Sequence, residues 1–184
     1  MATNISGSTG VSKVQDGTVT SAKIVDGAIT NADINTSAAI AGTKISGSFG
    51  KVLQVKLQQD SLILSLQSAS YTDTGLSISI TPSSTSSKIL AMWNVQGDLG
   101  VAGAGWGTQL VRGSTNIFTS SVKYAIYNPA SGGLRAHANY NQIDSPNTTS
   151  AVTYKVQVAS YDGKIVHFNG DGAQTQLILM EIAG

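Results

Sequence analysis

The chain has 184 residues, of which only 11% are charged, whereas 24 are serine, 18 are threonine and 20 are glycine. This composition favours extended backbone and turns over long charged helices. The formal net charge of +1 argues against a nucleic-acid groove or an anionic membrane surface as partner, because both need clustered positive charge. The absence of cysteine excludes disulfides and thiolate metal sites, so oligomerisation is the expected source of extra stability.

The N-terminal residues show no export signal. Residues 1–10 have neither a basic segment nor an apolar core, and no apolar run in the chain approaches the ~20 residues that span a bilayer. We therefore expect a protein that is made in a cytoplasm and does not insert into a membrane.

The first quarter of the chain is a repeat. Asp16–Ile24 aligns with Asp26–Ile34 ten residues later, and Ser37–Ile45 keeps the same apolar and small positions. The β-branched apolar residues consequently recur about every five positions, at Val14, Val19, Ile24, Ile29, Ile34, Ile40 and Ile45.

A period of five does not fit a single helix or strand. On a helix each step rotates the apolar residue by roughly 140°, and on a strand an odd step alternates its face. The Asp-Gly pairs at 16–17 and 26–27 predict turns, and Thr20 and Thr30 are suited to begin short capped turns. Several chains around one axis would bury one such residue each per layer. Residues 14–50 are therefore predicted to form an intertwined shaft; a disordered Ser/Gly linker is the alternative.

From Lys51 onward the apolar period becomes two, which predicts an antiparallel β-sandwich or barrel without helices. The final segment is apolar on both faces, which predicts a central strand near a subunit interface. The expected strands are Val52–Leu57, Leu62–Leu66, Leu76–Ile80, Ile89–Val95, Thr108–Val111, Val122–Tyr127, Ala136–Tyr140, Val152–Val158, Ile165–Phe168 and Leu177–Ile182.

The repeats resemble shaft segments of phage tail fibres and head fibres. Four segments of the remaining chain resemble the fibre-tip domains of marine phages: Ser86–Leu90, Gly105–Gly113, Asp144–Thr149 and Leu179–Gly184. This resemblance covers nearly the whole chain. It implies an all-β fold in which an N-terminal intertwined repeat shaft precedes a homotrimeric jelly-roll β-sandwich head, of the kind seen in tumour necrosis factor and complement heads.

Residues that could support catalysis or bind a metal are scarce. Glu181 is the only glutamate, and the nine aspartates are spread along the chain, mostly in turn contexts. A glycan-cleaving site usually needs two opposed carboxylates, so no catalytic residue is expected. His137 and His167 are the only histidines; a threefold axis could gather either one around an ion, but an ordinary polar histidine is favoured. No metal site and no cofactor are predicted.

Four aromatic residues are candidates for receptor or glycan contact: Trp106, Tyr124, Tyr127 and Tyr140. Trp106 lies within the glycine-rich segment Gly97–Gly107, which lacks the Gly-Lys-Ser/Thr ending of a phosphate loop. We expect a mobile or tightly turned loop there. A packing role at a loop–strand junction is the alternative for Trp106.

These features predict a non-enzymatic structural and adhesion protein on the surface of a phage virion. Residues 1–13 would attach the trimer to a capsid or tail protein, 14–50 would form the shaft, and 51–184 the head. The expected partners are two further copies of the chain, the virion protein, and a host surface glycan or receptor. The alternatives are a capsid decoration protein without receptor role, a fibre-borne glycan hydrolase and a secreted carbohydrate-binding module.

Overall fold

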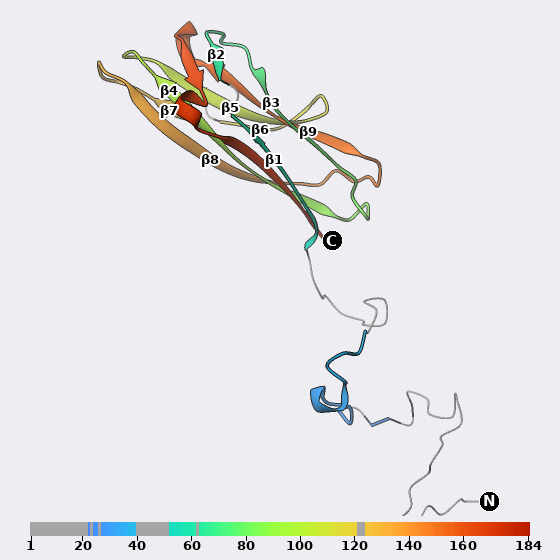
Figure 1. The fold of residues 1–184 in the computed structure, drawn as a ribbon. Coiled ribbons are helices and arrows are strands. Elements are labelled where there is room, and N and C mark those ends of the chain that lie inside the picture. Colours follow the sequence, from blue (N-terminus) through green and yellow to red (C-terminus); the bar gives the residue numbers. More distant parts are fainter. Residues whose placement is uncertain (1–21, 23, 26, 40–51, 62, 121–123) are drawn as a thin grey trace, which may run out of the picture. The chain divides into compact units, whose positions relative to one another are not determined.

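Figure 1 shows a computed structural model of the chain, which describes residues 22, 24–25, 27–39, 52–61, 63–120 and 124–184. The chain divides into two compact units, Met1–Gly47 and Ser48–Gly184. The predicted attachment segment 1–13 and the predicted boundary between residues 50 and 51 lie outside the described residues.

The described part of the first unit consists of short turns. Gly27 has a φ of +80°, and the Ala28 amide donates a 2.9 Å hydrogen bond to the Val25 carbonyl, which closes a turn at the predicted place. Thr30 begins the 3-10 turn η2 (Asn31–Asp33), because its amide and hydroxyl both donate to the Asp33 carboxylate at 2.8 and 2.7 Å. The predicted turns at Gly27 and Thr30 are confirmed.

The second unit is a sandwich of two antiparallel sheets. The first has the order β1-β11-β4-β10-β2, with β8 on the other edge of β4; the second has the order β3-β9-β5-β6, with β7 beside β5. The strands of the first sheet are β1 (Val52–Asp60), β2 (Leu64–Leu66), β4 (Lys88–Leu99), β8 (Leu134–Asp144), β10 (Val166–Phe168) and β11 (Thr175–Ile182). Those of the second are β3 (Thr72–Ile80), β5 (Gly105–Arg112), β6 (Thr115–Thr119), β7 (Ile126–Tyr127) and β9 (Val152–Ser160).

The predicted all-β sandwich is confirmed, and each predicted strand overlaps an observed one. Two differences concern the stretch after β5. Strand β6 was not predicted, because Ile117 and Phe118 are adjacent and give no period of two. It forms by hairpin pairing with β5 across a two-residue turn at Gly113, whose φ is +59°. Strand β7 is shorter than predicted, and residues 121–123 lie outside the described part.

The core lies between the sheets and follows the alternation in the sequence. On β3, Leu76, Ile78 and Ile80 are buried, whereas Ser77 and Ser79 are exposed. Burying each large aliphatic side chain contributes about 1.5–3 kcal/mol. Strand β11 alternates in the same way and lies between β1 and β4, so the prediction of a central final strand is confirmed.

Candidate functional site: the outer face of the first sheet

The outer face of the first sheet is apolar where β1, β11, β4 and β8 lie side by side. On β11, Leu177 and Leu179 are fully buried against the second sheet, so Ile178 and Met180 point to the opposite side. Ile178 is aligned between Leu57 on β1 and Met92 on β4. The cross-strand register thus joins apolar side chains from separate strands into one surface.

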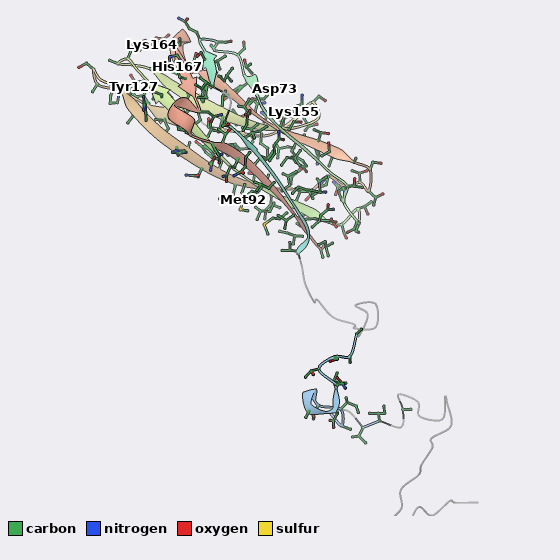
Figure 2. The ribbon with its side chains drawn as sticks, viewed as in Figure 1. Asp73, Met92, Tyr127, Lys155, Lys164 and His167 are labelled. Carbon is green, nitrogen blue, oxygen red and sulfur yellow. The ribbon has the colours of Figure 1, made fainter. Side chains whose placement is uncertain are left out.

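We call this surface the apolar face. Val55, Leu57 and Ile143 are 55%, 57% and 52% exposed, and the other members are half-buried by their neighbours. All of its members are uncharged, and Lys88, which is aligned with Ile182, points to the same side at its end. Figure 2 labels Met92 on the outer side of this sheet. Its members are Val55, Leu57, Leu90, Met92, Ile143, Ile178, Met180 and Ile182.

A band of carboxamides borders the apolar face. Together with Met92 and Ile178, the side chains of this band line a groove of about 280 Å³. The Asn94 side-chain oxygen accepts a 3.1 Å hydrogen bond from the backbone N–H of Gln176. The band consists of Asn94, Asn139, Asn141 and Gln176. Farther along β4 and β8, Arg135 forms a 2.9 Å ion pair with Asp98, so polarity increases along the strands away from Ile182.

A buried carboxylate secures β1 and β11 at the apolar end. The Glu181 side chain is fully buried and accepts hydrogen bonds from Gln54 Nε2 at 2.5 Å and from the amide and hydroxyl of Ser83 at 2.7 and 2.6 Å. Burial raises the pKa of the Glu181 carboxyl, but these donors outweigh burial and bring the pKa down to about 2. A single enclosed carboxylate surrounded by donors is suited to holding strands together. Sequence reasoning gave Glu181 no role, because its donors come from distant segments.

The predicted shaft residues that the structure describes are not buried within one chain. Ile24, Ile29 and Ile34 are 41%, 56% and 40% exposed. Val14, Val19, Ile40 and Ile45 lie outside the described residues. The intertwined core stays a prediction, and within one chain these three side chains are left open to solvent.

The structure corrects the prediction that Trp106 contacts a ligand. Its side chain is fully buried and packs edge-on against Phe168, with ring centroids 5.4 Å apart. Gly97 leaves room for the indole, because a Cβ at that position would collide with Nε1. The glycine-rich stretch around Trp106 thus serves close packing between β4 and β5, and its loop is tightly turned, with the Gly103 amide donating to the Asn128 carbonyl at 2.7 Å.

The remaining predicted contact residues do not form one site. Tyr140 is half-buried, stacks on Trp93 at 5.6 Å and lies 5.1 Å from Phe118, so its ring belongs to an aromatic cluster between the sheets. Tyr124 and Tyr127 are exposed and lie 5.0 Å apart. The structure adds Tyr161 to that pair, a residue that sequence reasoning missed because it is far away in the chain.

The described residues contain no group of three or more side chains suited to bind a metal ion. His137 is exposed on β8, and His167 shares a 2.8 Å hydrogen bond with the Ser65 hydroxyl through Nδ1. No helix among the described residues has the length and hydrophobicity to cross a bilayer.

No protein-family model and no curated protein sequence matches the chain. Among solved structures, the infectious bursal disease virus VP2 subviral particle matches 80% of this chain and 42% of its own chain, at 13% identity and a TM-score of 0.42. The structure of the Gt strain of that virus matches 83% of this chain and 45% of its own chain, at 13% identity and a TM-score of 0.38. Latent PorU from Porphyromonas gingivalis matches 74% of this chain and 14% of its own chain, at 10% identity and a TM-score of 0.32. The chain thus spans less than half of each matched chain, and TM-scores below 0.5 establish neither a common fold nor a common function.

Proposed function

We propose that this chain is a non-enzymatic structural subunit of a virus particle, assembled as a homotrimer through the apolar face of its head. Residues 14–50 form the shaft, residues 51–184 form the head, and residues 1–13 attach the trimer to a capsid or tail protein. The uncharged apolar face is the observation that carries this proposal.

Leaving this face in water is unfavourable. Each Å² of apolar surface removed from water contributes about 25 cal/mol, and contiguous exposed apolar patches mark interaction sites. A stable interface buries about 800 Å² on each partner, so the apolar face would form the centre of a larger contact. In a trimer the apolar faces of the three copies would point toward the threefold axis, where uncharged side chains can be buried without leaving unpaired charge.

Two further features support this assembly. The strand orders β1-β11-β4-β8 and β3-β9-β5-β6 are those of an eight-stranded jelly roll, the fold that the fibre resemblance implies for the head. Ile24, Ile29 and Ile34 are open to solvent in one chain, so several copies around one axis would bury them. We propose three copies because the head resembles trimeric fibre heads.

Sedimentation equilibrium of the full chain tests the assembly. We expect the mass of a trimer for the wild type and of a monomer for Ile178→Asp, because symmetry would bury three carboxylates in one interface. Ser79→Asp is the control, since Ser79 is exposed on the outer face of the other sheet. A monomeric wild type, or a trimeric Ile178→Asp variant, contradicts the proposal.

Antibody labelling tests the role in the particle. We expect an antibody raised against the head to label purified virus particles, and electron microscopy of the label distinguishes a tail fibre from a decoration of the capsid. Particles that carry no label contradict a virion role, whatever the oligomeric state.

A further inference from the structure

Three tyrosine rings converge at the end of the head opposite the C-terminus. Tyr124 lies 5.0 Å from Tyr127 and 4.6 Å from Tyr161, and Tyr127 lies 6.0 Å from Tyr161, measured between ring centroids. Tyr124 and Tyr127 are 41% and 38% exposed. Figure 2 labels Tyr127 and Lys164 at this end, whereas Figure 1 marks the C-terminus at the other. We call these three residues the tyrosine cluster.

The backbone beneath the tyrosine cluster holds the rings in place. Gly105 permits their close approach, because a Cβ there would lie 3.2 Å from Tyr127 Cδ2 and 3.3 Å from Tyr161 Cβ. The Asn128 amide donates to the Ala104 carbonyl at 2.8 Å, and its side-chain amide donates to the Gly132 carbonyl at 2.6 Å. A backbone held in this way needs little further ordering when a ligand binds.

Polar and charged side chains lie near the rings. Lys164 Nζ donates to the Ala102 carbonyl at 2.8 Å beside Gly103, whose neighbours include the Tyr127 hydroxyl. Asp162 is exposed in the left-handed conformation, with a φ of +54°. A hydrogen bond with Tyr161 raises the pKa of Tyr124 to about 12, and the Tyr124 hydroxyl is therefore neutral at pH 7.

This chemistry discriminates between classes of ligand. Aromatic faces favour apolar C–H surfaces, and neighbouring hydroxyl, ammonium and carboxylate groups favour a ligand rimmed with hydroxyls. A nucleic acid needs several cations along its backbone, whereas here Asp162 offsets Lys164. The same carboxylate disfavours an anionic sugar. A neutral saccharide presents both an apolar ring face and a hydroxyl rim.

We propose that the tyrosine cluster, with Lys164 and Asp162, is a shallow binding site for a neutral saccharide. Tyr124 and Tyr127 supply the stacking surface, and the Lys164 ammonium and Asp162 carboxylate bond to sugar hydroxyls. This inference extends the proposed function, because three such sites on one trimer would raise the avidity of a weak contact.

The test begins with the full chain on an array of immobilised neutral and anionic oligosaccharides. We expect binding to neutral members, and calorimetric titration of the best neutral oligosaccharide then measures the dissociation constant. Tyr124→Ala and Tyr127→Ala each raise that constant at least tenfold. Tyr124→Phe, which keeps the ring, changes it less than threefold, and Ile63→Ala, at another exposed apolar residue, leaves it unchanged.

Three results overturn the saccharide site: no binding by the wild type, binding to anionic members only, or affinity unaffected by both alanine variants. Sedimentation of the same samples separates this proposal from the assembly. A monomer that binds the saccharide retains the site and contradicts the trimer, whereas a trimer that binds none retains the assembly and contradicts the site.

Discussion

The two sheets of the head present opposite kinds of surface to their surroundings. On the second sheet, Lys155 Nζ lies 3.0 Å from an Asp73 carboxylate oxygen, Gln157 donates to the same carboxylate at 2.7 Å, and the hydroxyls of Ser79 and Thr153 are 2.7 Å apart. These polar side chains satisfy one another and water. On the first sheet, the corresponding positions from Ile178 to Ile182 are apolar, and polar side chains begin at Gln176 and Asn94.

This difference indicates what each outer surface is for. Both sheets use alternate residues to build the same core, so the core cannot explain why their outer positions differ. A solvated outer face is the ordinary state of an antiparallel sheet, and the second sheet conforms to it. The first sheet has the composition of a surface that is covered, which is why we infer assembly through it.

Substitutions at two adjacent residues of β11 should give the largest effects, because one side chain lies in the core and the other on the apolar face. Leu177→Ala removes a side chain buried within the chain and should lower the free energy of unfolding by about 2–5 kcal/mol. Ile178→Ala removes one from the apolar face and should instead raise the dissociation constant of the trimer. Urea denaturation measures the first effect, and sedimentation across a dilution series measures the second.

The control for this pair is the wild type at several concentrations. Its melting temperature should rise with protein concentration, because assembly stabilises the folded chain by mass action. Ile178→Ala could instead lower the free energy of unfolding as much as Leu177→Ala and leave the assembly unchanged. That result would contradict the assignment of Ile178 to an interface between copies.

Most of the fold was predictable because alternation is a local signal. The pattern of Leu76, Ile78 and Ile80 fixes which face of β3 is buried, whatever the strand pairs with. Pairing itself is not local. The apolar face depends on the register that places Leu57, Ile178 and Met92 in one row, and residues so far apart in the chain reveal it only after folding.

The predicted contact residues show the same limit. Trp106 and Tyr124 both stand near glycine or loop residues, so their sequence contexts look alike. Trp106 is buried against Phe168 in the space that Gly97 leaves. Tyr124 instead packs beside Tyr161 at the surface. Burial of an aromatic residue depends on the side chains of other strands that pack against it, and the local sequence does not reveal these contacts.

The stability of the fold should depend on pH through Glu181, which lies at the end of the apolar face. The Glu181 pKa lies at about 2 in the folded chain, below its ordinary value of 4.5, so ionised Glu181 stabilises the fold above pH 4.5. This contribution should be lost as the pH falls from about 4.5 to about 2. Glu181→Gln should cost on the order of 2 kcal/mol at pH 7, because charge-assisted hydrogen bonds from Gln54 and Ser83 are lost.

Urea denaturation at pH 7, 4 and 3 measures this dependence. The difference in stability between wild type and Glu181→Gln should shrink as the pH falls, since protonation removes the charge that the substitution removes. Asp60→Asn, another carboxylate of the first sheet, serves as the comparison variant. A difference that stays constant from pH 7 to pH 3 would show that the Glu181 charge does not hold β1 to β11.

The smallest effect is expected on the polar face. The Lys155 and Asp73 side chains are 40% and 48% exposed, so solvent screens their attraction, and Lys155→Met should change the free energy of unfolding by less than about 1 kcal/mol. Hydrogen bonds from Gln157 and Lys155 lower the Asp73 pKa, so what stability the pair contributes is present above pH 3.8 and is lost below it. The trimer mass should be unchanged. Dissociation of Lys155→Met, or a loss of several kcal/mol, would mean that the polar face is also covered by another molecule, and the contrast between the two faces would then no longer identify the interface.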